Sequence, residues 1–325
     1  MARRALSPTR LQLVHLLEQA IPEAQAATGV DACRIGLSGG ADSLALTAAM
    51  AWARDHRNGP LASIEVTARI VDHNLQPDSA AVAAAAAGQA ESLGIAAEVV
   101  RVHIDSSKMG IEAAAREARY AALHQGPPAL ILLAHTLDDQ AETVLLGLAR
   151  GSGVRSLAGM ASLRDFMVRP FLSIRRSDTE KACDEWGLTW WNDPTNHDPA
   201  YSRSRLRAAL PQLEETLGPK LVLNLARTAQ LCRIDADYLD QLARNCGVDV
   251  NQTTIPVCDL LRLDPALRHR LLLHWLRPIG RDAITREHVL AVDALLTDWH
   301  GQKSVLVPGG QVSRSNQNLN LLLSF

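Results

Sequence analysis

The sequence predicts an α/β protein: a parallel sheet in a first domain, followed by a smaller, mostly helical second domain. Short apolar runs alternate with helical patterns between residues 35 and 149, which is typical of parallel strands joined by crossover helices. A glycine-rich turn follows the first apolar run, at residues 38–43. Near Leu210-Pro211 the pattern changes to long amphipathic helices. We therefore place the first domain at residues 1–215 and the second at 216–325.

The elements of the first domain follow from apolar spacing and turn residues. Ser7-Pro8 is a helix start signal, and the first helix continues through Ile21. A strand at residues 35–37 leads into the glycine-rich turn and a helix that ends near Asn58-Gly59-Pro60. The remaining elements expected, in chain order, are a strand at 64–71, a helix at 79–93, a strand at 95–102, a helix at 111–124, a strand at 129–133 and a helix at 138–149.

The second domain is expected to contain helices at 221–245, 265–275 and 285–297. A hairpin-like tail at 305–323, around Pro308-Gly309-Gly310, closes the chain. No motif in this domain indicates a particular chemistry.

Composition excludes several classes of protein. The 325 residues carry a formal net charge of −2, so any surface that binds nucleic acid must be a local basic region. Arg3-Arg4 is followed by an amphipathic helix rather than by the apolar core of a signal peptide, and no stretch is apolar enough to span a bilayer. The five scattered cysteines indicate a reducing compartment. We expect a cytoplasmic protein without membrane contact.

Polar clusters follow three of the expected strands. Ligands of parallel sheets bind beyond the carboxyl ends of the strands, so these clusters should meet in one pocket. They are Ser38 to Ser43, Asp72 to Asn74, and His135 to Asp139.

The glycine-rich turn has the features of a phosphate-binding loop. Gly39 and Gly40 let successive N–H groups point into one concavity, and the helix that follows adds its positive end. Asp42 could hold a magnesium ion on the phosphates, while Ser38 and Ser43 supply hydroxyl donors. A Walker A run is absent from the sequence. The alternative is a tight turn with a capped helix.

A second cluster, at residues 133–143, combines a histidine with three carboxylates. Glu142 follows Asp138 by four residues and Asp139 by three, so these side chains share a helical face. Acids are also common in the first turn of an ordinary helix, which is the alternative. Beside a phosphate loop, such acids can bind metal or take protons, and His135 can stabilise charge on a phosphate.

These motifs resemble those of known enzymes. Residues 38–43 are similar to the pyrophosphate loop (PP-loop) of the N-type ATP pyrophosphatases, which have a Rossmann-like, adenine nucleotide alpha hydrolase-like fold. The order of the motifs resembles the tRNA(Ile)-lysidine synthetase family. The further motifs that carry this resemblance are Val71 to Leu75, Glu112 with Ala115-Arg116 and Arg119-Tyr120, Leu133 to Thr143, Arg150 to Gly153, and Trp191 to Asn196.

The resemblance implies a ligase. Such an enzyme joins free L-lysine to carbon 2 of the first anticodon cytidine of isoleucine tRNA with a CAU anticodon. ATP yields AMP and pyrophosphate through an adenylated cytidine, and the lysidine product changes codon recognition from AUG to AUA. The implied ATP-binding residues are Ser38, Gly39, Gly40, Ala41, Asp42, Ser43, Asp72, His73 and Asn74, with Asp42 also holding Mg²⁺. The implied catalytic residues are Asp139 first, Asp138 second, His135, and Glu142 and Arg116 to place lysine and the adenylated base.

An arginine-rich segment fits an RNA substrate. Beside the family motifs we favour tRNA contacts at Arg150, Arg203, Arg205 and Arg207. A solvated face of arginines paired with acids is the alternative. Two residues depart from the family pattern, Thr136 after the leading histidine and Ser204 where an asparagine is usual.

Two other functions stay open from the sequence. Another PP-loop tRNA-modifying enzyme, such as a thiolase, would typically need a pair of cysteines at a spacing that this chain lacks. A nonenzymatic ATP-dependent RNA binder would not need the intact Asp42, His135, Asp138 and Asp139. The oligomeric state is not predicted, although a homodimer is compatible with the sequence.

Overall fold

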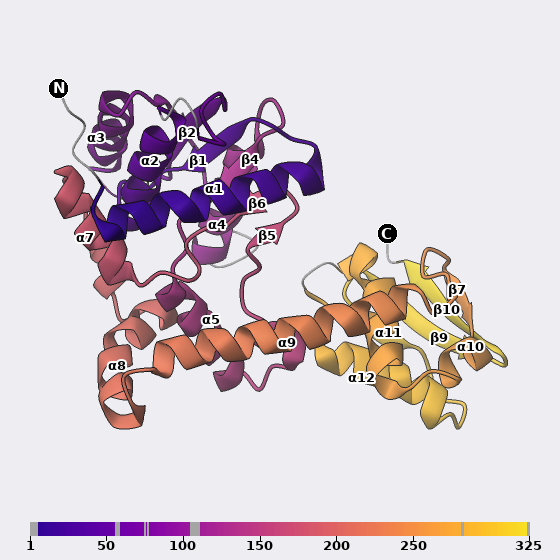
Figure 1. Cartoon of the computed structure of the whole chain (residues 1–325). Helices are drawn as coiled ribbons and strands as arrows, with labels where there is room; N and C mark the ends of the chain where they lie inside the picture. Colours follow the sequence, from indigo (N-terminus) through magenta and orange to yellow (C-terminus); the bar gives the residue numbers. More distant parts are fainter. Residues whose placement is uncertain are drawn as a thin grey trace. The chain divides into compact units, whose positions relative to one another are not determined.

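The computed structural model describes residues 6–55, 59–74, 76, 78–104, 111–280 and 283–323, without the side chains of residues 111, 112 and 197. The chain divides into two compact units, residues 1–230 and 231–325 (Figure 1). The predicted domain boundary after residue 215 stays a prediction. Four sequence-based assignments lie outside the described part: Arg3-Arg4, Asn58, Leu75 and the side chain of Glu112.

The first unit contains a six-stranded sheet with the order β3-β2-β1-β4-β6-β5. The first five strands in this order are parallel to their neighbours, and β5 is antiparallel to β6. This topology confirms the predicted parallel α/β fold. The strands are β1 (Cys33–Gly36), β2 (Val66–Asp72), β3 (Ala96–Arg101), β4 (Leu130–Leu132), β5 (Leu163–Arg164) and β6 (Met167–Val168).

Helices cover both faces of this sheet. The larger core lies on one face, where α1 (Pro8–Thr28), α2 (Ala41–Arg54), α3 (Ser79–Ser92) and α7 (Arg176–Trp186) pack. On β4, Leu130 and Leu132 point into that core, whereas Ile131 packs with Leu123 of α4 (Ile111–His124). Since alternate residues of a strand face opposite sides, α4 lies on the other face.

The chain then adds helices that the sequence-based prediction did not assign between residues 153 and 220. Leu137 and Ala141 of α5 form a small core with Leu210 and Val222. This core fixes the start of α5 at the end of β4. The unassigned elements are α6 (Val154–Leu157), α7, a 3₁₀ turn (Pro194–His197) and α8 (Ser202–Leu217), whereas α5 (Leu137–Ala149) and α9 (Leu221–Arg244) were predicted.

The second unit combines helices with an antiparallel sheet of order β7-β10-β9-β8. Trp275, Leu272 and Val312 lie in its core. The predicted hairpin at the end of the chain is present, and Gly309 (φ +83°) lies at one of its turns. β7 was not predicted. The elements are β7 (Thr254–Pro256), α10 (Val257–Leu261), α11 (Pro265–Gly280), α12 (Arg286–Thr297), β8 (Val305–Val307), β9 (Gly310–Ser315) and β10 (Asn318–Leu323).

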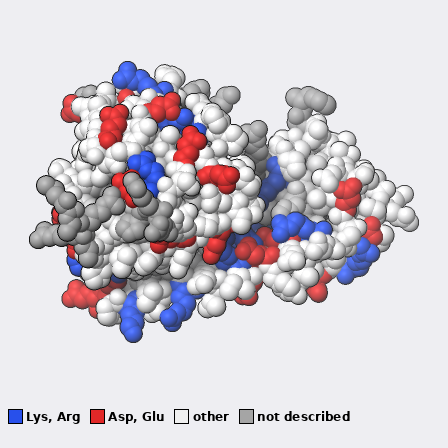
Figure 2. Space-filling model, turned by 45° about the horizontal axis from the view of Figure 1, so that its top comes forward, with Lys and Arg blue, Asp and Glu red and all other residues white. Residues whose placement is uncertain are grey.

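No helix in the described ranges has the length and apolar character that crossing a membrane requires. On the face drawn in Figure 2, basic and acidic side chains lie interspersed rather than in one continuous basic field. On this face, contact with nucleic acid would depend on local groups of basic side chains rather than on one basic field.

Candidate active site

The glycine-rich turn joins β1 to α2 at the carboxyl edge of the sheet. Gly39 has φ +84°, a conformation that side chains disfavour, and Gly40 begins the helix in an extended conformation. The Ser43 hydroxyl donates to the Gly40 carbonyl at 3.0 Å and accepts from the Ser38 N–H at 3.2 Å. The loop is thus braced by its own hydroxyls, and the N-terminus of α2 faces any phosphate that it holds.

Asp42, in the first turn of α2, is held by α7. Its Oδ2 accepts from Arg176 Nε at 3.1 Å, and its Oδ1 accepts from the Thr179 hydroxyl. Burial raises the pKa of Asp42 to about 6; Arg176 opposes this rise, and Asp139 adds to it.

Arg176 connects the glycine-rich loop to the acid cluster of α5. The same guanidinium that binds Asp42 places Nη2 at 2.8 Å from Asp139 Oδ1 and Nη1 at 3.8 Å from Glu142 Oε1. The sequence-based prediction gave Arg176 no role in the site. The structure shows it at the centre of three carboxylates.

Asp139 is fixed by the start of its own helix. Thr136 is the N-cap of α5, and its N–H and hydroxyl each donate to Asp139 Oδ2 at 2.8 Å. Burial alone would raise the pKa of Asp139, but Arg176, His135 and the Thr136 hydrogen bonds hold it below the usual value. Asp139 is therefore an ionised carboxylate at neutral pH. Thr136, which departs from the family pattern, orients it.

Asp138 points to a different set of partners. Its Oδ2 accepts from the backbone N–H of Arg176 at 2.8 Å, and its Oδ1 lies 3.1 Å from Arg175 Nε. Arg175 also binds Glu214 of α8. Asp138 thus ties the start of α7 to α5, whereas Asp139 faces the side chain of Arg176.

Glu142 is completely buried and is surrounded by arginines of α8. Arg207 Nε donates to it at 2.8 Å, and Arg203 Nη1 lies 3.5 Å from it. Arg207 also lies 3.5 Å from Asp139. Two of the arginines predicted to bind tRNA therefore pair with acids inside this cluster. Arg205 instead donates to the carbonyls of Pro199 and Ala200.

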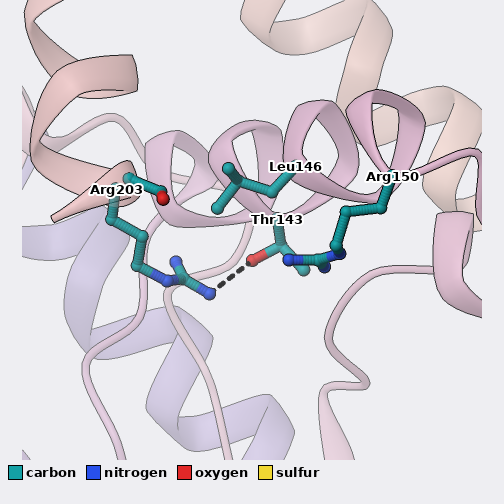
Figure 3. A pocket seen from close by; sticks show the side chains of 5 residues that line it. Thr143, Leu146, Arg150 and Arg203 are labelled. Carbon is teal, nitrogen blue, oxygen red and sulfur yellow. Dashed lines mark hydrogen bonds between the residues drawn. The ribbon is translucent and has the colours of Figure 1, made fainter. Parts of the chain in front are cut away.

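A pocket of about 200 Å³ lies between α5 and the start of α8, and Figure 3 shows its lining. Arg203 donates to the Thr143 hydroxyl at 3.2 Å, and Arg150 extends to the same place from the end of α5. Leu146 and Ser202 complete the wall. The structure thus brings Arg150 and Arg203 together.

The polar residues after β2 and β4 lie at the same edge of the sheet. Buried Asp72 accepts from the Asn74 N–H at 2.9 Å and binds Arg101 at 3.2 Å. Burial lowers the pKa of His135 to about 4, so this imidazole is neutral at pH 7 and can stabilise a phosphate only by hydrogen bonding. Within the described residues, His73 and His135 each have a buried Nδ1 without a hydrogen-bond partner.

The side chains near the glycine-rich loop can be compared with the ligands that Mg²⁺ takes at nucleotide sites. Among the residues that the structure describes, no three His, Cys, Asp or Glu side chains are grouped to hold a metal ion. Mg²⁺ at nucleotide sites usually takes one or two carboxylates together with phosphate oxygens. A single carboxylate beside the loop, Asp42, fits that pattern once the hydrogen bond from Arg176 or from Thr179 to one of its oxygens is broken.

The chain is similar to known proteins over most of its length. The model of the PP-loop domain family matches residues 12–214, and that of the TilS substrate binding domain matches residues 256–319. A tRNA(Ile)-lysidine synthase of Mycolicibacterium paratuberculosis is 50% identical over 84% of this chain and 83% of that protein. The enzyme of that name from Leifsonia xyli is 47% identical over 87% of each chain. In three dimensions, the U34-tRNA thiolase NcsA of Methanococcus maripaludis has a TM-score of 0.55 at 18% identity, over 69% of this chain and 80% of that one, a likeness of fold alone.

Proposed function

The chain belongs to the tRNA(Ile)-lysidine synthase family, and from this membership we propose its reaction in detail. It is an ATP-using enzyme that forms lysidine on tRNA(Ile). In our proposal it joins free L-lysine to carbon 2 of the first anticodon cytidine in the CAU tRNA, and it works in the cytoplasm. The observation that carries this proposal is the arginine-bridged pairing of a glycine loop with Asp139 and Glu142, in a chain that resembles lysidine synthases over most of its length.

The first half-reaction activates the cytidine. The cytidine O2 attacks the α-phosphorus of ATP, the bond to pyrophosphate breaks, and the oxygen becomes part of a good leaving group. The loop from Ser38 to Ser43 and the start of α2 would hold the pyrophosphate. Mg²⁺ at Asp42 would neutralise charge on the phosphates. Asp72, His73 and Asn74 would lie beside the adenosine.

The second half-reaction uses the acid cluster. Lysine's side-chain amine attacks carbon 2, AMP leaves, and the amine loses its proton. Asp139, ionised and oriented by Thr136, attracts the lysine ammonium and is our first choice to take the proton. Glu142 and Arg116 would place lysine and the adenylated base. Asp138 is a weaker candidate, because its oxygens bind Arg175 and the backbone of Arg176.

We propose that both parts of the chain contact the tRNA. Arg150 and Arg203 at the pocket, with Arg205 and Arg207, would contact RNA near the anticodon. The domain that begins at residue 216 would contact it elsewhere, which the TilS substrate binding match supports. A homodimer is also proposed, and sedimentation would test it.

The test is incorporation of radiolabelled lysine into a CAU tRNA(Ile) transcript with ATP and Mg²⁺. We expect incorporation by the wild type and none by Asp42→Ala, with methionine tRNA, which has the same anticodon, as a negative control. A folded wild-type protein that binds ATP and RNA without incorporating lysine would refute the proposal. It would favour another PP-loop modification or a nonenzymatic RNA binder.

A further inference from the structure

Three arginines meet around one tyrosine on the α4 face of the sheet. The guanidinium of Arg116 lies 4.9 Å from the centre of the Tyr120 ring, and that of Arg119 lies 5.6 Å from it. Tyr120 packs against Leu123 of α4. Arg169, which follows β6 and is only 6% exposed, contacts the Sδ of Met167, which packs against the same small core as Tyr120, and the Tyr120 hydroxyl is buried without a hydrogen-bond partner among the described residues. We name Arg116, Arg119, Tyr120 and Arg169 the arginine–tyrosine site.

Among the residues that the structure describes, the arginines of this site lack the carboxylate partners that other arginines of the protein have. Arg176, Arg203 and Arg207 each pair with carboxylates. By contrast, the charge of Arg116 adds to burial in lowering the pKa of both Arg119 and Arg169. A tyrosine is uncharged at neutral pH and offsets none of this charge. Among the carboxylates that the structure describes, none forms an ion pair with the three arginines of the site.

Several buried polar atoms in this unit lack hydrogen-bond partners among the described residues. The Nε of Arg169 is buried and has no hydrogen-bond partner within the described ranges, as is true of Nδ1 in His73 and in His135. The pKa of His73 is lowered by burial and then by Arg119. The pKa of His135 is lowered by burial, raised in part by Asp139, and lowered further by Arg169 and Arg119. Both imidazoles are therefore uncharged at neutral pH.

Gathering like charges and unsatisfied donors in a partly buried place costs free energy that a bound anion would recover. Guanidinium groups match the oxygens of a phosphate in particular, because their N–H groups form a planar fork. The glycine-rich loop, which serves the phosphates of ATP in our proposal, continues into α2 on the other face of the sheet. A nucleotide seated on that loop leaves the α4 face available for a second phosphate.

We propose that the arginine–tyrosine site binds a phosphodiester of the tRNA backbone beside the target cytidine. This inference rests on the proposed function, since the anion belongs to the RNA substrate. Arg119 and Arg169 would hold the nucleotide by its backbone, beside Arg116, which in our proposal places the adenylated base, while the carboxylates on α5 handle lysine. A phosphate of ATP has the same chemistry, so the experiment must separate the two sources.

The test compares Arg119→Gln with Arg54→Gln. Arg54 lies in the last turn of α2, at the amino edge of the sheet, where it donates to the Gly94 carbonyl, so its removal changes net charge equally. Binding of a labelled CAU anticodon stem-loop is measured by fluorescence anisotropy at several KCl concentrations, and ATP binding by calorimetry. We expect Arg119→Gln to weaken RNA binding about tenfold, to reduce the salt slope by about 0.7, and to leave ATP binding unchanged.

The other outcomes decide against the proposal. Weaker ATP binding with unchanged RNA binding would assign the site to the nucleotide, and equal behaviour of the two variants would remove the anion site. Arg119→Met repeats the test if Arg119→Gln does not fold, and Arg119→Lys, which keeps the charge, should restore the salt slope. If the wild type formed no lysidine while Arg119→Gln still weakened stem-loop binding, the proposed function would fall and the phosphate site would stand.

Discussion

The Nε atom of Arg176 lies 3.1 Å from Oδ2 of Asp42. The same side chain reaches Asp139 at 2.8 Å, so one guanidinium spans the interval between two helix starts. Asp42 begins the helix after the glycine loop, and Asp139 begins the helix after β4. A cation that Asp42 or Asp139 accepts must therefore compete with Arg176, which couples the proposed ATP and lysine sites electrostatically.

Arg176→Ala should impair both half-reactions. Asp42, Asp139 and Glu142 would lose a shared counter-charge, and their mutual repulsion would rise. Since the arginine side chain is 22% exposed, we expect a stability loss of about 1–3 kcal/mol, in the range of one or two hydrogen bonds to charged groups. We expect kcat/KM to fall about 100-fold or more for both ATP and lysine. Urea unfolding and steady-state kinetics measure the two effects.

The neighbouring Arg175→Ala is the matched control. Arg175 binds Asp138 and Glu214 and is 38% exposed, so its loss should cost stability without changing the affinity for ATP. If the two variants had the same kinetics, Arg176 would be only a structural residue.

Asp139→Asn and Asp138→Asn should separate the roles of two adjacent acids. Asp139→Asn removes the charge that faces Arg176 and disturbs the capping box with Thr136, so lysidine formation should fall about 1000-fold. Asp138→Asn weakens the attachment of α7 and should cost about 1 kcal/mol, with activity within about tenfold of wild type. Single-turnover transfer from a preformed adenylate is the measurement. The reverse order of activities would identify Asp138 as the base.

The loop and the acid cluster could be predicted because each is a local pattern placed by a general rule. A glycine pair after an apolar run marks a strand-to-helix turn, and parallel strands bring such turns to one edge. Arg176 could not be identified in this way. It lies 134 residues from Asp42 in sequence, and nothing around it distinguishes it from Arg164, which is exposed.

Some of the short strands could not be predicted from the sequence either. β5 and β6 have two residues each and β7 has three, too few for alternation to show. The final hairpin was predictable because Pro308-Gly309-Gly310 separates two apolar runs. The acid pairing of Arg203 and Arg207 depends on α8 packing beside α5, a tertiary contact without a local signature.

Gly39→Ala tests the phosphate loop. A side chain at φ +84° is strained by about 1–2 kcal/mol, although its Cβ would stay 3.4 Å from the nearest atom, on Ala86. The loop can relieve this strain only by rotating the N–H groups that we assign to pyrophosphate, so ATP affinity should fall at least about tenfold. Calorimetric titration with ATP and Mg²⁺ measures it.

Gly29→Ala is the control for that variant. Gly29 ends α1 at φ +71° with open space around its Cβ position, so the strain is comparable and the site is distant in sequence. Similar stability losses with unequal ATP affinities are expected. A Gly39→Ala protein that bound ATP normally would contradict the assignment of this loop.

His135 should make stability depend on pH in a predictable direction. Its pKa falls from 6.5 to about 4 on folding, so between these two pH values the unfolded chain is protonated at His135 and the folded protein is not. Above pH 6.5 His135 is neutral in both states, so it does not reduce the free energy of unfolding. As the pH falls from 6.5 toward 4, protonation of the unfolded chain lowers the free energy of unfolding. Between pH 7 and pH 5 the wild type should lose about 2 kcal/mol more than His135→Gln, which cannot titrate there.

Asp42 acts in the opposite sense, since its raised pKa makes stability fall as pH rises through the range up to about 6. The difference between wild type and His135→Gln in urea unfolding cancels the contribution of Asp42, and a difference that did not change with pH would show that His135 has the same pKa in the folded and unfolded states.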